Sequence, residues 1–262
     1  MTVGVSGFCA AYFAADFGAP WSVVVGLVSF GVFQAVAGLR LQKRVKADMD
    51  AVQAILMAGQ KRIQEKMHRW QMRPPGSIQA AQREIFEDTR VFVREAIAQT
   101  ETLRKYRLWV PMMERQIATA QLQLNWMIKD FKRVDELMPK AMFLDPSLVA
   151  VKMARMYMLN ADMKEIEKTY LKAVGRLRYN QNVLLAAAMS WMQVKKGDVQ
   201  GAFKTLTEAL KKSDNEALKQ NHAHLMNNRV THFNNSGIGE QWYSLLLEEP
   251  KVKTQRQRSV YR

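Results

Sequence analysis

The segment GDVQGAFKTLTEAL, at Gly197–Leu210, decides the fold because two earlier segments of the chain share its pattern. ADMKEIEKTYLKAV, at Ala161–Val174, begins 36 residues before it, and KDFKRVDELMPKAM, at Lys129–Met142, begins 32 residues earlier still. Each segment carries an aspartate near its start and a small residue near its end, namely Asp198 and Ala209, Asp162 and Ala173, and Asp130 and Ala141. Self-similarity at this spacing is typical of stacked helical repeats.

A second helical stretch precedes each of these segments and completes a pair of helices. Its packing positions carry small or apolar residues: Ala118, Leu122, Ala150, Met153, Ala154, Tyr157, Ala186 and Met189. We therefore expect residues 111–250 to form an all-α solenoid of three to four helix pairs, with a degenerate terminal pair at 215–248 as its cap. Only 13 Gly and 7 Pro occur in 262 residues, which argues against a turn-rich all-β fold.

The pattern resembles the tetratricopeptide repeat, a helix–turn–helix unit of about 34 residues. The resemblance covers about 115–214 and is best over Val183–Asp214, although the unit lengths are 32 and 36 and Lys129 stands where a turn glycine is common. It implies a platform that binds a protein partner. The residues that we expect to pack the repeats are Ala141, Ala154, Tyr157, Ala173, Gly197, Ala202, Leu206 and Ala209.

Methionine and aromatic residues are frequent in this region, and they have two interpretations. They either fill gaps in the core or form an adaptable groove for a protein partner on the concave side. Under the second interpretation the candidate binding surface consists of Met156, Tyr157 and Met192.

The amino-terminal end is almost uncharged. Residues 1–39 contain one charged residue, Asp16, whereas all 39 basic and the other 23 acidic residues lie in 40–262. Trp21–Leu39 has no charge over 19 residues, roughly 28 Å as a helix and close to the ~30 Å of a hydrocarbon core. We predict that 1–39 is a membrane anchor, either a single transmembrane helix or a hairpin with the apolar segment 1–15. The alternative is a buried hairpin in a soluble protein.

Four basic residues follow the apolar end, namely Arg40, Lys43, Arg44 and Lys46. Because positive charge favours the cytoplasmic side, we expect a bacterial-type inner (cytoplasmic) membrane protein with its main domain in the cytoplasm.

A helical stalk is predicted for residues 40–110. Apolar residues recur every three or four positions from Leu41 to Trp70, and RPPGS at 73–77 then interrupts the helix. Ser77 is a suitable N-cap for a second helix that ends before Pro111. Two such helices are expected to pack antiparallel within one chain, with an intermolecular coiled coil as the alternative.

No motif in the sequence points to catalysis. The glycines at 237 and 239 lack the lysine or third glycine of a nucleotide-binding loop, and His222 and His224 face different sides of a helix. The single cysteine, Cys9, lies in the apolar end, and Glu248 with Glu249 is typical of a solvated helix end. We predict no enzyme, no cofactor and no metal site.

The chain ends in a basic arm at 251–262, KVKTQRQRSVYR, whose five cations are Lys251, Lys253, Arg256, Arg258 and Arg262. For the basic patches of this chain, of formal charge +15, we favour membrane lipid as partner, then an acidic protein, and nucleic acid least. The predicted function is a membrane-anchored scaffold for protein–protein interaction. The alternatives are a structural subunit of a larger membrane complex and a nucleic-acid-binding protein that uses this arm.

Overall fold

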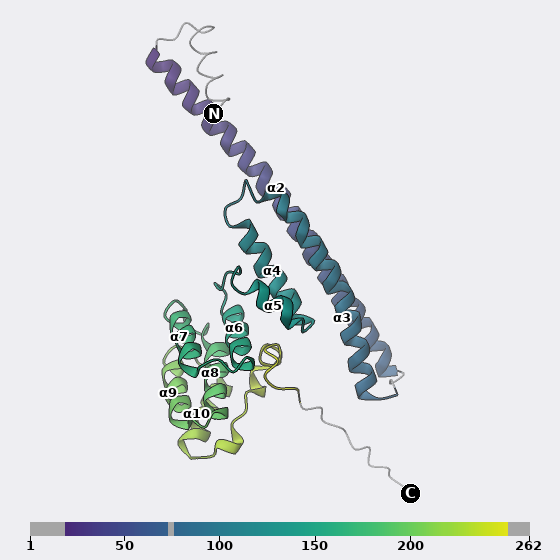
Figure 1. Ribbon diagram of the computed structural model, residues 1–262, viewed down its shortest axis with the longest axis vertical. Helices are drawn as coiled ribbons and strands as arrows, with labels where there is room; N and C mark the ends of the chain where they lie inside the picture. The colour runs from purple at the N-terminus through teal and green to yellow at the C-terminus, as the bar shows by residue number, and fades with distance from the viewer. Residues whose placement is uncertain (1–18, 73–75, 251–262) are drawn as a thin grey trace. The chain divides into compact units, whose positions relative to one another are not determined.

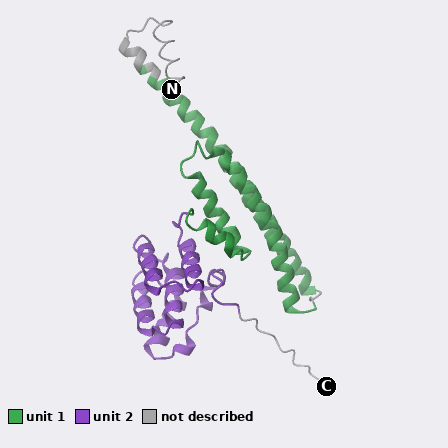
Figure 2. Ribbon diagram, in the orientation of Figure 1, with its two compact units in different colours: residues 1–141 green, residues 142–262 purple. Residues whose placement is uncertain are grey.

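A computed structural model describes residues 19–72 and 76–250, with the side chains of 19–23, 25 and 26 excepted. Every regular element in these ranges is a helix, which confirms the all-α class (Figure 1). The chain divides into two compact units, Met1–Ala141 and Met142–Arg262 (Figure 2). The apolar segment 1–15 with Cys9, and the basic arm 251–262, lie outside the described residues.

Unit 1 is built on a long helical hairpin, as predicted. Helix α2, Ala19–Met72, and helix α3, Ile78–Thr100, lie side by side and antiparallel (Figure 1). The Ser77 hydroxyl accepts a hydrogen bond from the Ala80 backbone N–H at 3.1 Å, which confirms the predicted N-cap. One continuous helix, α2, joins the predicted anchor to the predicted stalk.

Part of the predicted apolar stripe of α2 packs inside the hairpin, whereas Met49 and Met67 of the same stripe are exposed. Val52, Leu56 and Ile63 pack against buried side chains of α3. Gly59 lies opposite the Phe92 ring, and a Cβ atom at this position would overlap that ring, so the close approach requires glycine. At the closed end Lys66 forms ion pairs with Glu84, at 2.7 Å, and with Asp88, and these contacts raise the pKa of the lysine.

The second stalk helix ends earlier than predicted. It stops at Thr100, and a 3-10 helix, η1, follows over Glu101–Tyr106. The Thr100 hydroxyl competes for a backbone carbonyl at this point, because it donates a hydrogen bond to the Ile97 carbonyl at 2.6 Å. The same hydroxyl accepts a hydrogen bond from the Gln121 side-chain amide at 2.9 Å. Helices α4, Met113–Met127, and α5, Phe131–Leu137, complete unit 1 as the first predicted helix pair.

Unit 2 contains the second and third predicted pairs. Its elements are α6 Pro146–Met158, α7 Met163–Val174, α8 Val183–Lys195, α9 Val199–Leu210, α10 Glu216–Met226, η2 Val230–His232, η3 Ser236–Ile238 and α11 Glu240–Tyr243. Within the unit, α8 packs against α6, α7 and α9, and α10 packs against α9. The predicted terminal pair is reduced to α10 and the single turn of α11.

The aspartates of the repeated segments explain where the second helix of each pair begins. Asp130, Asp162 and Asp198 are the N-cap residues of α5, α7 and α9. Their carboxylates accept hydrogen bonds from backbone N–H groups two or three residues later, at 3.2, 3.1 and 2.8 Å. Gly197 precedes the third cap with φ of +85°, a left-handed conformation that favours glycine.

Among the described residues, no helical stretch combines the length and the apolar character that a membrane crossing requires. The predicted span at Trp21–Leu39 falls partly on residues whose side chains are not described, and the segment 1–15 is outside the description. The anchor therefore stays a prediction.

Candidate functional site

Half of the eight residues expected to pack the repeats lie in the core of unit 2. The fully buried ones are Ala154, Ala202, Leu206 and Ala209. Tyr157 and Ala173 are half-buried, as is Ala141 in unit 1, and Gly197 is exposed in the turn before α9. Tyr170, which occupies the position of Leu206 in the repeat frame, is also buried, and burial raises its pKa to about 12. The large position of the repeat frame is thus buried in both pairs of unit 2, whereas the small position is buried at Ala209 and half-buried at Ala173.

Met192 does not lie on a binding surface, so this prediction is wrong. The side chain is 0% exposed because α8, VLLAAAMSWMQVK, is apolar on almost every face and is covered by its neighbours. Met156 and Tyr157, on α6, keep partial exposure.

An aromatic row crosses three helices of unit 2. The rings of Tyr157 and Trp191 meet edge to face at 5.6 Å, and those of Trp191 and Trp242 do so at 5.8 Å. Glu248 accepts hydrogen bonds from both indole N–H groups, at 2.8 Å from Trp191 and 2.9 Å from Trp242. The interpretation of Glu248 as a solvated helix end is therefore wrong, because its carboxylate ties the end of unit 2 to α8.

A pocket of about 380 Å³ lies between the start of α6 and the end of α7. Its apolar wall includes Phe143, Leu144, Val149, Ala173 and Leu177. Four cations also line it: Lys152, Lys168, Lys172 and Arg176. No acidic side chain contributes to the lining, so the pocket combines apolar contact with positive charge.

The four pocket cations have no acidic partner within the described residues. Lys168 and Lys172 lie four residues apart on one face of α7, where like charges repel each other. Lys152 places its ammonium group 5.0 Å from the centre of the Phe143 ring. An anionic group in this pocket would relieve the repulsion and leave an adjoining apolar group in contact with the wall.

Met156 adjoins this pocket, although it does not line it. Thr169, a lining residue, places its hydroxyl 3.9 Å from the Met156 sulfur. Met156 was predicted from the sequence as a candidate binding residue, whereas the four cations of the pocket were not. The sequence does contain a pattern that indicates these cations. Lys164, Lys168 and Lys172 are spaced four residues apart, which places three like charges on one helix face.

A second candidate interaction surface is the amino-terminal part of α2, where apolar side chains are exposed along more than three helical turns. They are Val24, Leu27, Val28, Val32, Phe33, Val36 and Leu39. The predicted basic cluster follows at Arg40, Lys43, Arg44 and Lys46, all exposed. Nothing within the described part of the chain covers this apolar surface.

The histidines are not arranged as a metal centre in the described residues, where no group of three His, Cys, Asp or Glu side chains is placed to hold an ion. His224 and His232 do come together, with ring centres 5.6 Å apart. His222 instead stacks on Phe203 at 4.5 Å and lies 3.0 Å from the Thr207 hydroxyl.

Comparisons of the chain with protein-family models, with curated proteins and with solved structures each find no match.

Proposed function

We propose that the protein is a membrane-attached, non-enzymatic scaffold that holds a protein partner on its helix pairs. The observation that carries this proposal is the composition of α2. In one continuous helix, exposed apolar residues up to Leu39 give way to the basic cluster 40–46 and then to the packed stalk. A bilayer would cover the apolar side chains, and its anionic headgroups would attract the cations.

The basic pocket of unit 2 supports the second half of the proposal. Helix pairs that resemble tetratricopeptide repeats offer extended surfaces for protein binding. The pocket's four cations and apolar wall are complementary to a peptide segment in which acidic residues flank an apolar one. We propose such an acidic segment as the part of the partner that unit 2 binds.

Deleting residues 1–39 is expected to move the protein from the membrane to the soluble fraction. The remaining chain keeps the basic cluster but loses the apolar end, and the cluster alone gives binding that salt removes. The measurement is flotation with vesicles, followed by a wash at high salt. A full-length control with Arg40, Lys43, Arg44 and Lys46 changed to Gln should stay attached. Retention of the truncated chain after the wash would contradict the proposal.

Reversing two pocket charges tests the partner site. The probe is a fluorescent synthetic peptide with one phenylalanine between glutamates, and the variant is Lys168→Glu with Lys172→Glu. Loss of two attractive contacts is expected to weaken binding by about 10- to 100-fold. The matched control, Lys204→Glu with Lys212→Glu, makes the same change in net charge at exposed positions outside the pocket. Equal weakening in both variants would show that the peptide responds to net charge and not to the pocket.

A further inference from the structure

The segment between η1 and α4 exposes three large apolar side chains within five residues. Leu108 is 85% exposed, Trp109 is 74% exposed and Met112 is 62% exposed. Single exposed apolar residues are ordinary on a protein surface, but a cluster at the tip of one loop marks an interaction surface. Tryptophan in particular is enriched where a membrane meets water.

This loop lies beside the part of α2 where apolar residues give way to basic ones. A cavity of about 1190 Å³ is lined from one side by Phe33, Arg40 and Arg44, and from the other by Lys105 and Trp109. All these residues belong to unit 1. Trp109 thus lies beside the stretch of α2 from Phe33 to Arg44, where the proposed membrane segment ends.

Several contacts hold the loop beside α2. Leu103 and Tyr106 of η1 are buried against Leu41 and Val45 of α2. Lys105 forms an ion pair with Asp48 of α2 at 2.8 Å, and this contact lowers the pKa of the Asp48 carboxyl. Because the base of the loop is already packed, placing its tip in a membrane costs little extra ordering.

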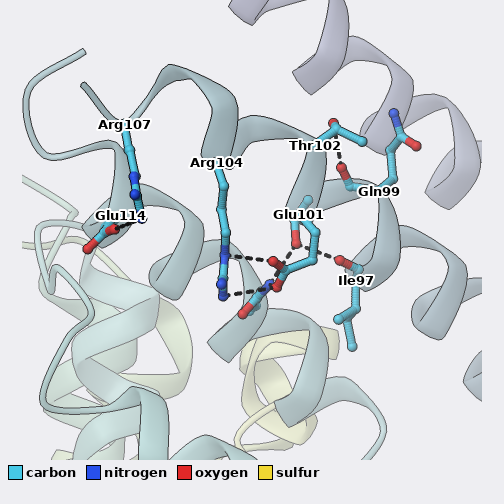
Figure 3. Close-up of polar contacts among 9 residues, drawn as sticks. Ile97, Gln99, Glu101, Thr102, Arg104, Arg107 and Glu114 are labelled. Carbon is cyan, nitrogen blue, oxygen red and sulfur yellow. Dashed lines mark hydrogen bonds and ion pairs between the residues drawn. The ribbon is translucent and has the colours of Figure 1, made fainter. Parts of the chain in front are cut away.

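The two ends of the loop lie close to each other. Arg107 and Glu114, on either side of the exposed residues, approach to 3.9 Å, whereas the pair of Arg104 with Glu101 at 2.6 Å lies within η1 (Figure 3). Met112 adopts a left-handed conformation with φ of +61°, which turns the chain sharply into α4. The result is a short, closed loop that presents its apolar residues outward.

Charge favours an anionic bilayer as the surface that covers this loop. Arg40 and Arg44 line the cavity, and Lys43 and Lys46 are exposed on the same stretch of α2. None of these four cations forms an ion pair among the described residues, and a cation near the membrane surface contributes attraction to anionic lipid of about 1 kcal/mol.

We infer that the loop Leu108–Met112 is a second membrane contact, in which Trp109 and its apolar neighbours enter the interface of an anionic bilayer. This inference rests on the proposed membrane attachment and goes beyond it. With two contacts on one bilayer, the apolar end of α2 and this loop fix the rotation of unit 1 about the axis of α2.

The test uses the full chain with Cys9→Ser, so that an introduced cysteine is unique. A fluorophore is attached at Leu108→Cys, and the protein is bound to vesicles of phosphatidylcholine and phosphatidylglycerol. One vesicle series contains lipid with a nitroxide near its headgroup. We expect this lipid to quench the label and the vesicles to shield it from an aqueous quencher. A label at Leu159→Cys, an exposed leucine in unit 2, is the control and should stay in water.

A second variant separates membrane entry from simple proximity. Trp109→Glu, added to the labelled chain, places a charge at the tip of the loop and is expected to abolish most of the lipid quenching while the chain still floats with the vesicles. If the labelled chain that keeps Trp109 floats but its label is unquenched, the loop inference is overturned and the anchor proposal survives. Shielding from the aqueous quencher without lipid quenching indicates a protein contact, such as a second copy, and also overturns the inference. A chain that does not float overturns both.

Discussion

Replacing Trp242 by alanine is expected to destabilise unit 2 by about 3–5 kcal/mol, the range for removing a large buried aromatic side chain. Trp242 is 0% exposed and meets Trp191 edge to face at 5.8 Å. Its loss leaves a cavity beside α8, and the Glu248 carboxylate then loses one of its two indole donors. The destabilisation should be visible as a lower midpoint in urea denaturation followed by circular dichroism.

Two control variants separate the causes of this effect. Trp109→Ala removes the same side chain from an exposed position in unit 1 and should change stability by less than about 0.5 kcal/mol. Glu248→Ala keeps both rings but removes the acceptor of two indole N–H groups, so it should cost about 1–3 kcal/mol for each donor left without water. If Trp242→Ala behaved like Trp109→Ala, the aromatic row would not be holding the end of unit 2.

The helix pairs could be predicted because their signals are local. An aspartate that caps a helix acts through backbone groups two or three residues away, so Asp162 and Asp198 mark the helix starts in any context. The same holds for Ser77 at the start of α3. The stripe of α2 could be predicted in part, since a spacing of three and four residues indicates the buried face for Val52, Leu56 and Ile63, although Met49 and Met67 of the same stripe are exposed.

The contacts between distant segments could not be predicted in this way. Glu248 lies 57 residues from Trp191, and nothing in the letters around either one indicates that they meet. The reduced terminal pair depends on a similar long-range network, in which the buried Asn221 side chain bonds Asn235 at 2.7 Å and the Asn234 backbone at 2.8 Å. The prediction that Met192 lies on a binding surface was wrong because its burial depends on how many helices pack around α8, and the local sequence does not show this number.

The basic pocket of unit 2 could be predicted only in part, because some of its residues follow a local pattern and others depend on helix packing. Lys168 and Lys172 stand on one face of α7, which their spacing predicts. Lys152 and much of the apolar wall, namely Phe143, Leu144 and Val149, come from α6 and the segment before it. A pocket formed by two helices is visible only once their packing is known. The exposed loop at Leu108–Met112 escaped prediction because the second stalk helix was expected to continue almost to Pro111.

Enlarging Ala209 to leucine is expected to cost about 1–3 kcal/mol through overpacking. Ala209 lies on α9, is 1% exposed and is the residue whose recurrence as Ala173 and Ala141 defined the repeat frame. Its carbonyl accepts hydrogen bonds from the Asn182 side chain at 3.1 Å and from the Ser213 hydroxyl at 2.9 Å. A leucine side chain needs a shift of α9 against its neighbours, which would strain both bonds.

The design of this experiment separates side-chain size from other effects of substitution at Ala209. Ala209→Ser changes polarity with little added volume and should cost less than Ala209→Leu, because a serine hydroxyl can bond a carbonyl one turn earlier in the helix. Ala223→Leu makes the same enlargement at an exposed position of α10 and should stay within about 0.5 kcal/mol of wild type. The free energy of unfolding of all three variants is measured by urea denaturation. If the Ala209→Leu variant had the same free energy of unfolding as wild type, α9 would have room for a larger side chain on this face. Helix packing would then not require the small residue that defines the repeat frame.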